Sequence, residues 1–184
     1  MLEIEMKFPV TDLAAVVARL VELGARPGAT REEADHYFNA PHRDFAQTDE
    51  ALRIRRIGTS NRVTYKGPRR PGPDKTRSEI EVALGDGDET FADFARILTS
   101  LGFRAVAVVS KRRAGYELHR DGFDMEACLD EVDGVGRFVE LEILAPEEAL
   151  DKARAVLQDV AHALKLVDSE RRSYLEMLLL ASAR

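Results

Sequence analysis

Three segments of the sequence alternate charged residues with aliphatic ones, and this pattern constrains the fold more than any other feature. The segments are Glu3-Ile4-Glu5-Met6-Lys7, Glu79-Ile80-Glu81-Val82 and Glu140-Leu141-Glu142-Ile143. Successive side chains of a β-strand point to opposite faces, so each segment, as a strand, would aim its charges at a single face. One such strand is typical of a sheet with a solvated outer face. Three of them indicate a polar interior.

The charges of the chain are unevenly distributed. Residues 43–77 carry a net charge of +6, whereas the whole chain carries −6, which leaves −12 for the remaining residues. The basic residues of this stretch are Arg43, Arg53, Arg55, Arg56, Arg62, Lys66, Arg69, Arg70, Lys75 and Arg77. Cations gathered in one region and carboxylate pairs in others favour a site for a polyanion together with metal ions. The acidic total argues against general binding of duplex nucleic acid but leaves a local phosphate site open.

Length and composition indicate one globular domain. The chain has 184 residues, of which 45% are hydrophobic and 33% charged, and this is enough to bury a core. The longest apolar run, residues 177–181, is far below the roughly 20 residues that span a bilayer. The first residues are acidic and strand-like, so we expect no secretory signal. A single cysteine excludes an intramolecular disulfide, and we therefore expect a cytoplasmic protein that does not enter membranes.

Hydrophobic periodicity and turn residues predict strands and helices arranged around one antiparallel sheet. After the N-terminal strand we expect a helix from Thr11, as its N-cap, to about Leu23, and a second helix over 88–101. Further helices should begin at Pro146 and Ser169, and strands are expected at 31–39, 52–57, 62–66, 77–84, 105–113, 116–118, 123–132 and 137–144. The stretch 67–74, rich in Pro and Gly, is predicted to be a mobile loop. The order of elements suggests a loose duplication with halves of about 1–84 and 85–184.

Charged side chains that share one face of a sheet must avoid the cost of burial, which reaches several kcal/mol for an isolated charge. The simplest solution is a sheet that closes into a water-filled barrel. Carboxylates from different strands could then hold Mg²⁺ or Mn²⁺, which prefer oxygen ligands. Arg and Lys from neighbouring strands would neutralise phosphate oxygens. The expected fold class is therefore α+β, with the helices outside the barrel.

An ordered set of short motifs resembles the CYTH family, whose members are also called triphosphate tunnel metalloenzymes. The motifs are Glu3-x-Glu5-x-Lys7, Asp35-His36-Tyr37-Phe38, Ala51-Leu52-Arg53-Ile54-Arg55, Thr64-Tyr65-Lys66-Gly67-Pro68, Arg77-x-Glu79-x-Glu81, Lys111-x-Arg113-x-x-Tyr116, Leu129-Asp130 and Phe138-Val139-Glu140-Leu141-Glu142. The resemblance continues in order to Ser173-Tyr174 and so covers nearly the whole chain. Within the family, the stretch from Arg43 to Arg53 is most similar to the bacterial and archaeal class IV adenylyl cyclases.

The resemblance implies a closed or nearly closed eight-stranded antiparallel barrel whose bore takes a triphosphate. It implies Mg²⁺ or Mn²⁺ as the cofactor, held by the acids Glu3, Glu5, Asp130, Glu140 and Glu142. The residues it implies for catalysis are Glu3, Glu5, Lys7, Glu140 and Glu142. Phosphate binding is implied for Lys7, Arg53, Arg55, Lys66, Arg77, Lys111 and Arg113. Glu79 and Glu81, together with Arg77, would complete the tunnel wall.

Two reactions fit this set of ligands. In an adenylyl cyclase, the ribose 3′-hydroxyl of ATP attacks the α-phosphorus and gives cyclic AMP and pyrophosphate, and the resemblance favours this reaction. In a triphosphatase, water attacks the terminal phosphorus of an inorganic, nucleoside or thiamine triphosphate. A polyphosphate or nucleotide sensor without turnover is a third hypothesis, although a pure anion binder gains nothing from so many carboxylates. The cyclase group also suggests a homodimer.

Other reactive residues form no recognisable site. The four histidines lack a Cys or His at zinc spacing and are expected to be solvated or packed. Cys128 is expected to be a small strand residue rather than a nucleophile, and Arg69-Arg70 is expected to be solvated. Tyr116 and Tyr174 could pack or contact substrate, and the sequence leaves both roles open.

Overall fold

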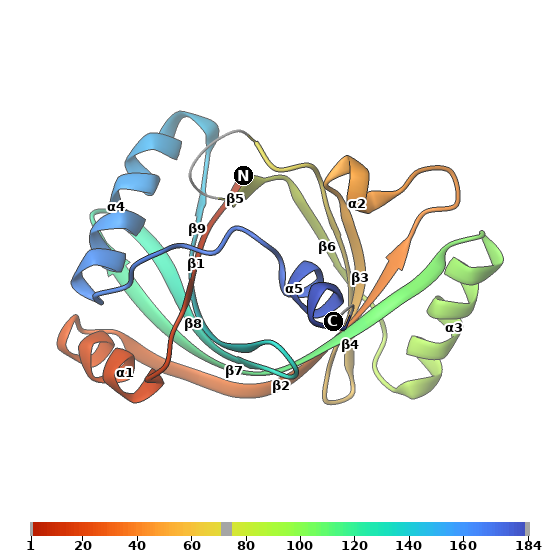
Figure 1. Cartoon of the computed structure of the whole chain (residues 1–184), viewed down its shortest axis with the longest axis horizontal. Coiled ribbons are helices and arrows are strands. Elements are labelled where there is room, and N and C mark those ends of the chain that lie inside the picture. Colours follow the sequence, from red (N-terminus) through yellow and green to blue (C-terminus); the bar gives the residue numbers. More distant parts are fainter. Residues whose placement is uncertain (1, 71–74, 183–184) are drawn as a thin grey trace.

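A strongly curved antiparallel sheet forms a nearly closed barrel in the computed structural model, which describes residues 2–70 and 75–182 (Figure 1). The strands are β1 (Leu2–Pro9), β2 (Arg26–Asn39), β3 (Ala51–Ile57), β4 (Ser60–Lys66), β5 (Lys75–Arg77), β6 (Glu79–Ala83), β7 (Arg104–Arg120), β8 (Phe123–Val132) and β9 (Gly136–Ala145). The helices are α1 (Leu13–Glu22), α2 (Phe45–Thr48), α3 (Asp88–Ser100), the 3₁₀ turn η1 (Glu147–Ala149), α4 (Leu150–Ala163) and α5 (Tyr174–Ser182). None of the helices in this described part is long and apolar enough to cross a membrane. The predicted barrel with helices outside it is confirmed.

The two edges of the nearly closed barrel are strands that are almost contiguous in sequence. In the strand order β5-β1-β9-β8-β7-β2-β3-β4-β6, the two edges are β5 and β6, and only Ser78 separates them. β5 pairs with β1 at one edge, and β6 pairs with β4 at the other. We expected eight strands, and the described part of the chain has nine, because the predicted strand 77–84 changes its pairing partner at Ser78.

Two predicted helix starts are wrong because a residue later in the sequence caps each helix. Asp12, rather than Thr11, caps α1 by accepting a hydrogen bond from a backbone N–H of the first turn. The last helix begins after Ser173 and not at Ser169. Ser173 and Glu176 exchange side-chain to backbone hydrogen bonds of 3.1 and 2.6 Å, which is the reciprocal arrangement of a capping box.

Strand lengths also differ from the predictions. β2 begins at residue 26 instead of 31. β7 continues without a break through residues 114–115, because these residues pair with β8 like those on either side of them. The short helix α2 was not predicted. Of the loop predicted at 67–74, residues 71–74 lie outside the described residues.

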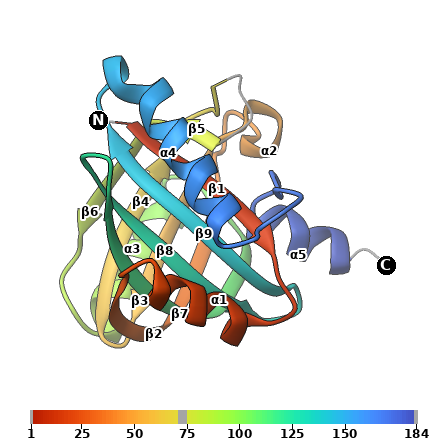
Figure 2. The ribbon, with the colours of Figure 1, turned by 90° about the vertical axis from the view of Figure 1, so that its left-hand side faces the viewer.

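Apolar side chains on the outer surface of the barrel pack beneath the helices. α4 lies across β1 and β9 (Figure 2), and the cluster below it and α1 contains the buried residues Ile4, Leu141 and Leu157. A second cluster joins α3 to β2 and β3 through Leu98 and Ile54. Most of the hydrophobic core is therefore outside the barrel, although a third cluster containing Phe138 and Tyr174 packs beside α5. Most of the barrel interior is left to charged side chains.

Leu141 and Leu144 provide a matched test of this core because both lie on β9. Leu141 is completely buried, whereas Leu144 is 61% exposed. Replacing Leu141 by alanine should lower the free energy of unfolding by about 2–5 kcal/mol. Leu144→Ala should change it by less than about 0.5 kcal/mol. Chemical denaturation followed by circular dichroism measures both, and equal losses would contradict a core on the outer surface.

Candidate functional site

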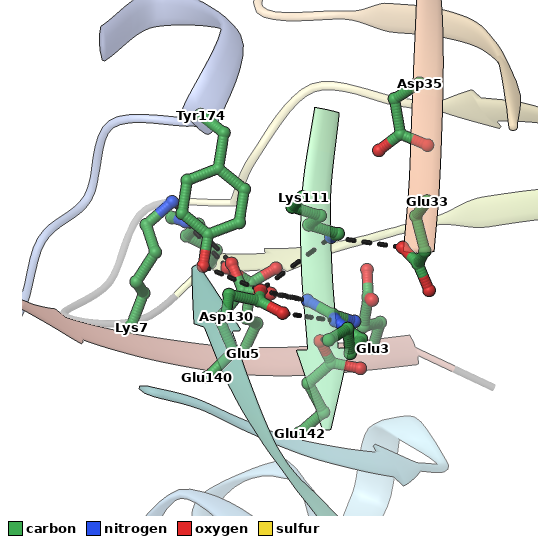
Figure 3. Close-up of polar contacts among 12 residues, drawn as sticks. Glu3, Glu5, Lys7, Glu33, Asp35, Lys111, Asp130, Glu140, Glu142 and Tyr174 are labelled. Atoms are coloured by element: carbon green, nitrogen blue, oxygen red, sulfur yellow. Dashed lines mark hydrogen bonds and ion pairs between the residues drawn. The ribbon is translucent and has the colours of Figure 1, made fainter. Parts of the chain in front are cut away.

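Charged side chains from all nine strands point into the barrel and line a cavity of about 510 Å³. Its acids include Glu3, Glu5, Glu79, Glu81, Glu126, Glu140 and Glu142. Its basic residues include Lys7, Arg53, Arg55, Lys66, Lys75, Arg77, Lys111 and Arg113. Figure 3 shows the acids of β1 and β9 gathered below Lys111. Alternation along the strands thus produces a polar tunnel that contains both signs of charge.

Three carboxylates of this tunnel form a cluster. Glu3, Glu5 and Glu142 each bring an oxygen to within 4.8 Å of the others, and the pairing of β1 with β9 sets Glu5 opposite Glu142. Burial raises the pKa of Glu3 to about 8 and that of Glu142 to about 7. Such values indicate carboxylates that lack enough positive charge around them. A divalent cation that prefers oxygen ligands supplies this charge, so the cluster fits Mg²⁺ or Mn²⁺.

The other two acids implied for metal binding, Asp130 and Glu140, lie against Arg113. Arg113 donates hydrogen bonds of 2.7 and 2.6 Å to Asp130 and a further one to Glu140. Tyr174 of α5 also donates to Asp130, at 2.8 Å. Both acids are nearly or completely buried. In this arrangement they fix the guanidinium group of Arg113 in the tunnel.

Arg53 and Arg55 converge on one carboxylate, that of Asp35. Arg55 donates to it at 2.7 and 2.8 Å and Arg53 at 3.0 Å. Burial opposes ionisation of Asp35, but the two guanidinium groups outweigh it and hold the pKa of Asp35 well below its ordinary value. The Nε atom of Arg53 is buried and has no hydrogen-bond partner among the described residues. This pair of arginines therefore retains a donor for an additional anion.

Lys66 and Lys111 place buried ammonium groups between carboxylates. The Lys66 Nζ atom lies 3.1 Å from Glu3 and 2.5 Å from Glu79. Burial disfavours the Lys66 cation, but these carboxylates outweigh it and raise its pKa. The Lys111 Nζ atom lies 3.3 Å from Glu33, and burial lowers the pKa of Lys111. Lys66 therefore connects the carboxylate cluster with the basic side of the tunnel.

Lys7 and Lys75 lie on neighbouring strands. The Lys7 Nζ atom is 3.7 Å from Glu140 and 4.0 Å from the centre of the Tyr174 ring. Burial lowers the pKa of Lys7 to about 7. Lys75 donates a hydrogen bond of 2.6 Å to Glu5. Lys7 was predicted to bind phosphate, and Lys75 adds another ammonium group to the lining of the tunnel.

The three residues expected in the tunnel wall differ in environment. Arg77 has a buried Nε atom without a hydrogen-bond partner among the described residues. Glu79 is half-buried beside Lys66. Glu81 is exposed and accepts a hydrogen bond of 2.9 Å from Arg62. Arg77 and Glu79 thus belong to the interior, and Glu81 belongs to the rim.

Three buried charged residues of the tunnel, Glu33, Asp35 and Lys75, were not predicted as site residues. Glu33 precedes Asp35 by two positions and therefore shares its face of the strand. Lys75 precedes Arg77 by two positions and shares its face in the same way. The predicted strand at 31–39 contained Glu33, but the family motif in it begins only at Asp35, and the predicted strand at 77–84 began two residues after Lys75. Tyr174, whose role the sequence left open, packs inside the tunnel mouth against Phe138.

The histidine and cysteine predictions agree with the structure at the two positions where contacts are clearest. The ring of His36 packs against Phe91, with 4.5 Å between the ring centres. Cys128 is completely buried, and burial raises the pKa of its thiol. A thiol in this environment is not a nucleophile.

Arg69 was predicted to be solvated, but in the structure it is bound to other residues. Its Nε atom donates to Asp49 at 2.7 Å, and its Nη1 atom donates to the Arg171 carbonyl at 2.7 Å. The second contact joins the segment after β4 to the segment before α5. The prediction holds for Arg70, which is exposed and pairs with Glu147.

Known proteins share this architecture. The CYTH domain profile matches residues 1–174. A protein of Methanocaldococcus jannaschii with a provisional adenylate cyclase name is 37% identical over 180 residues, which cover 96% of this chain and 98% of the relative. Adenylate cyclase CyaB of Aeromonas hydrophila is 32% identical over 176 residues, which cover 94% and 86%. The solved structure of the PH1819 protein of Pyrococcus horikoshii has a TM-score of 0.83, with 35% identity and 99% of both chains covered.

Glu33 provides a pH test of the buried ion pairs. Burial opposes its ionisation, but Lys111 and Arg55 outweigh burial and lower its pKa from 4.5 to about 2. A carboxylate with a lowered folded pKa stabilises the fold above its unfolded pKa, and this contribution is lost as the pH falls through the folded value. Glu33→Gln should therefore cost about 3–5 kcal/mol near neutral pH. The cost should shrink as the pH falls from 4.5 toward 2.

Thermal unfolding at neutral pH and in acid measures this difference. Glu32→Gln is the matched control, because the Glu32 side chain lies on the same strand and is 78% exposed. A cost for Glu33→Gln that stays constant with pH would contradict the ionised, buried state of Glu33.

Proposed function

The chain belongs to the CYTH domain family, and on this premise we propose that it is a metal-dependent adenylyl cyclase that converts ATP into cyclic AMP and pyrophosphate. One observation carries the proposal: the cluster of Glu3, Glu5 and Glu142 shares a cavity with buried Arg and Lys side chains. Reactions at phosphorus depend mainly on positioning and on neutralising charge. The cavity offers both.

The basic side chains of the tunnel would bind the triphosphate. Arg53 and Arg55 offer planar forks of donors suited to phosphate oxygens, whereas Lys66 and Lys111 offer point charges. Each of these cations already rests against a carboxylate. The site is therefore held in place before a ligand arrives, which lowers the cost of ordering it on binding.

The carboxylate cluster would hold Mg²⁺ or Mn²⁺ next to the phosphates. When bound, this ion would neutralise phosphate oxygens and lower the barrier to attack on phosphorus. Lys66, at 3.1 Å from Glu3, would keep a phosphate beside the cluster. Arg113, whose Nη1 atom lies 3.8 Å from Glu142, would bind phosphate on the other side. The chain itself thus orients the triphosphate between two fixed cations.

The relatives support a cyclase over a triphosphatase. A triphosphatase would use the same charged groups with water as the nucleophile in place of the ribose 3′-hydroxyl. The two relatives that are 37% and 32% identical both have adenylate cyclase names. We therefore place the cyclase first and keep the triphosphatase as the second candidate.

Product analysis tests the reaction directly. The purified protein is incubated with Mg²⁺ or Mn²⁺ and either ATP or tripolyphosphate, and nucleotides, pyrophosphate and phosphate are resolved by ion-exchange chromatography. We expect cyclic AMP and pyrophosphate from ATP in equal amounts, and no product after chelation of the metal. Phosphate release without cyclic AMP, fastest from tripolyphosphate, would establish the triphosphatase instead.

Charge removal at the cluster tests the metal site. Glu3→Gln or Glu142→Gln keeps the size of the side chain but removes one negative charge, and should lower turnover by about 10²–10³-fold. Glu131→Gln is the control, because Glu131 pairs with Arg112 and Arg137 at the surface. Undiminished turnover in both tunnel variants would contradict the metal assignment. Tighter binding of tripolyphosphate by these variants, without turnover in the native protein, would favour a polyanion sensor.

A further inference from the structure

Lys75 is a buried cation that depends on a single carboxylate. The pairing of β5 with β1 places it opposite Glu5. Its Nζ atom donates to Glu5 at 2.6 Å, and its side chain is only 5% exposed. Within residues 2–70 and 75–182, Glu5 has the only carboxylate found within 4.0 Å of this ammonium group. Glu5 is therefore the close counter-ion of Lys75.

β5 is also held in place by contacts that do not involve the charge of Lys75. Three consecutive residues of β5 are paired with β1 through the backbone. The buried Thr76 accepts a hydrogen bond of 3.3 Å from Arg154 of α4. These contacts fix the strand from both sides, so the ammonium group of Lys75 is available for a role inside the tunnel.

Glu5 has a second role in the carboxylate cluster with Glu3 and Glu142. A divalent ion bound there would place two positive charges beside the Lys75 ammonium group. Glu5 would then share its carboxylate between the ion and Lys75, and a buried ammonium group whose counter-ion is drawn away is strongly unfavourable. A phosphate oxygen bound beside the cluster would supply the missing negative charge.

We propose that Lys75 couples metal binding to triphosphate binding. The metal ion takes over Glu5, and the Lys75 ammonium group then binds an oxygen of the triphosphate. Lys7, whose side chain lies beside that of Lys75, offers a second ammonium group to the same oxygen. The coupling is reciprocal, since a ligand that tightens binding of a second one is itself bound more tightly by the same factor. This inference rests on the proposed metal and triphosphate site.

Lys75→Met tests the coupling because it keeps the aliphatic part of the side chain and removes the charge. Without triphosphate, the variant should bind Mn²⁺ more tightly than the native protein, because Glu5 no longer has a competing cation. With Mn²⁺ at saturation, it should bind tripolyphosphate about tenfold more weakly, the loss expected for one charge-assisted hydrogen bond. Without metal, when Glu5 holds the Lys75 ammonium group, the loss of tripolyphosphate affinity should be smaller. Electron paramagnetic resonance of free Mn²⁺ and isothermal titration calorimetry measure these affinities.

Lys111→Met is the matched control. Its ammonium group lies beside Glu33, at 3.3 Å, and not against the carboxylate cluster, so its loss should weaken tripolyphosphate binding with and without metal. Lys75→Gln gives a second neutral variant if the methionine variant fails to fold.

Two results would overturn the proposal. One is Mn²⁺ binding by the neutral Lys75 variants that is no tighter than in the native protein. The other is a loss of tripolyphosphate affinity that is the same with and without metal. Native protein that binds neither Mn²⁺ nor tripolyphosphate would overturn the proposed function itself, and this outcome is recognised before any variant is made.

Discussion

The pairing of opposite charges inside a closed sheet is the constraint on which the rest of the structure depends. A charge moved from water into a protein interior costs several kcal/mol unless a partner and hydrogen bonds compensate it. Asp35 is compensated by Arg53 and Arg55, and Asp130 is compensated by Arg113. Such partners come from neighbouring strands whose alternate side chains face the same space. A closed barrel therefore meets a requirement that an open sheet, with its inner face covered by helices, would not.

This compensation is incomplete in one part of the tunnel, and the candidate site lies there. The cluster of Glu3, Glu5 and Glu142 has too little positive charge around it, as the raised pKa values of about 8 for Glu3 and about 7 for Glu142 indicate. On the basic side, Arg53 and Arg77 each retain a buried Nε atom without a hydrogen-bond partner among the described residues. A cation and an anion bound together would correct both deficits. The paired regions thus stabilise the fold, and the unpaired ones favour ligand binding.

Side-chain direction could be predicted from the sequence, but pairing across the barrel could not. Alternation is a local property, and it identified the inner face of β1, β6 and β9 from their glutamates alone. Which charges meet is set by the register between strands that are distant in sequence. The resemblance gave Asp130 as a metal-binding acid, but only the pairing of β7 with β8 shows that Asp130 lies opposite Arg113. The contact between Lys75 and Glu5 likewise depends on β5 reaching β1, and 70 positions separate the two residues.

Because only Ser78 separates β5 from β6, the two edges of the sheet must come together for the binding site to form. Arg77 lies opposite Glu3 on one side of Ser78, and Glu79 lies opposite Lys66 on the other. An open sheet would separate these pairs and leave only halves of a binding site. A ligand that contacts both sides is bound by the closed form alone, and its binding free energy is added to that of closure. Binding of such a ligand and closure of the sheet between β5 and β6 therefore stabilise each other.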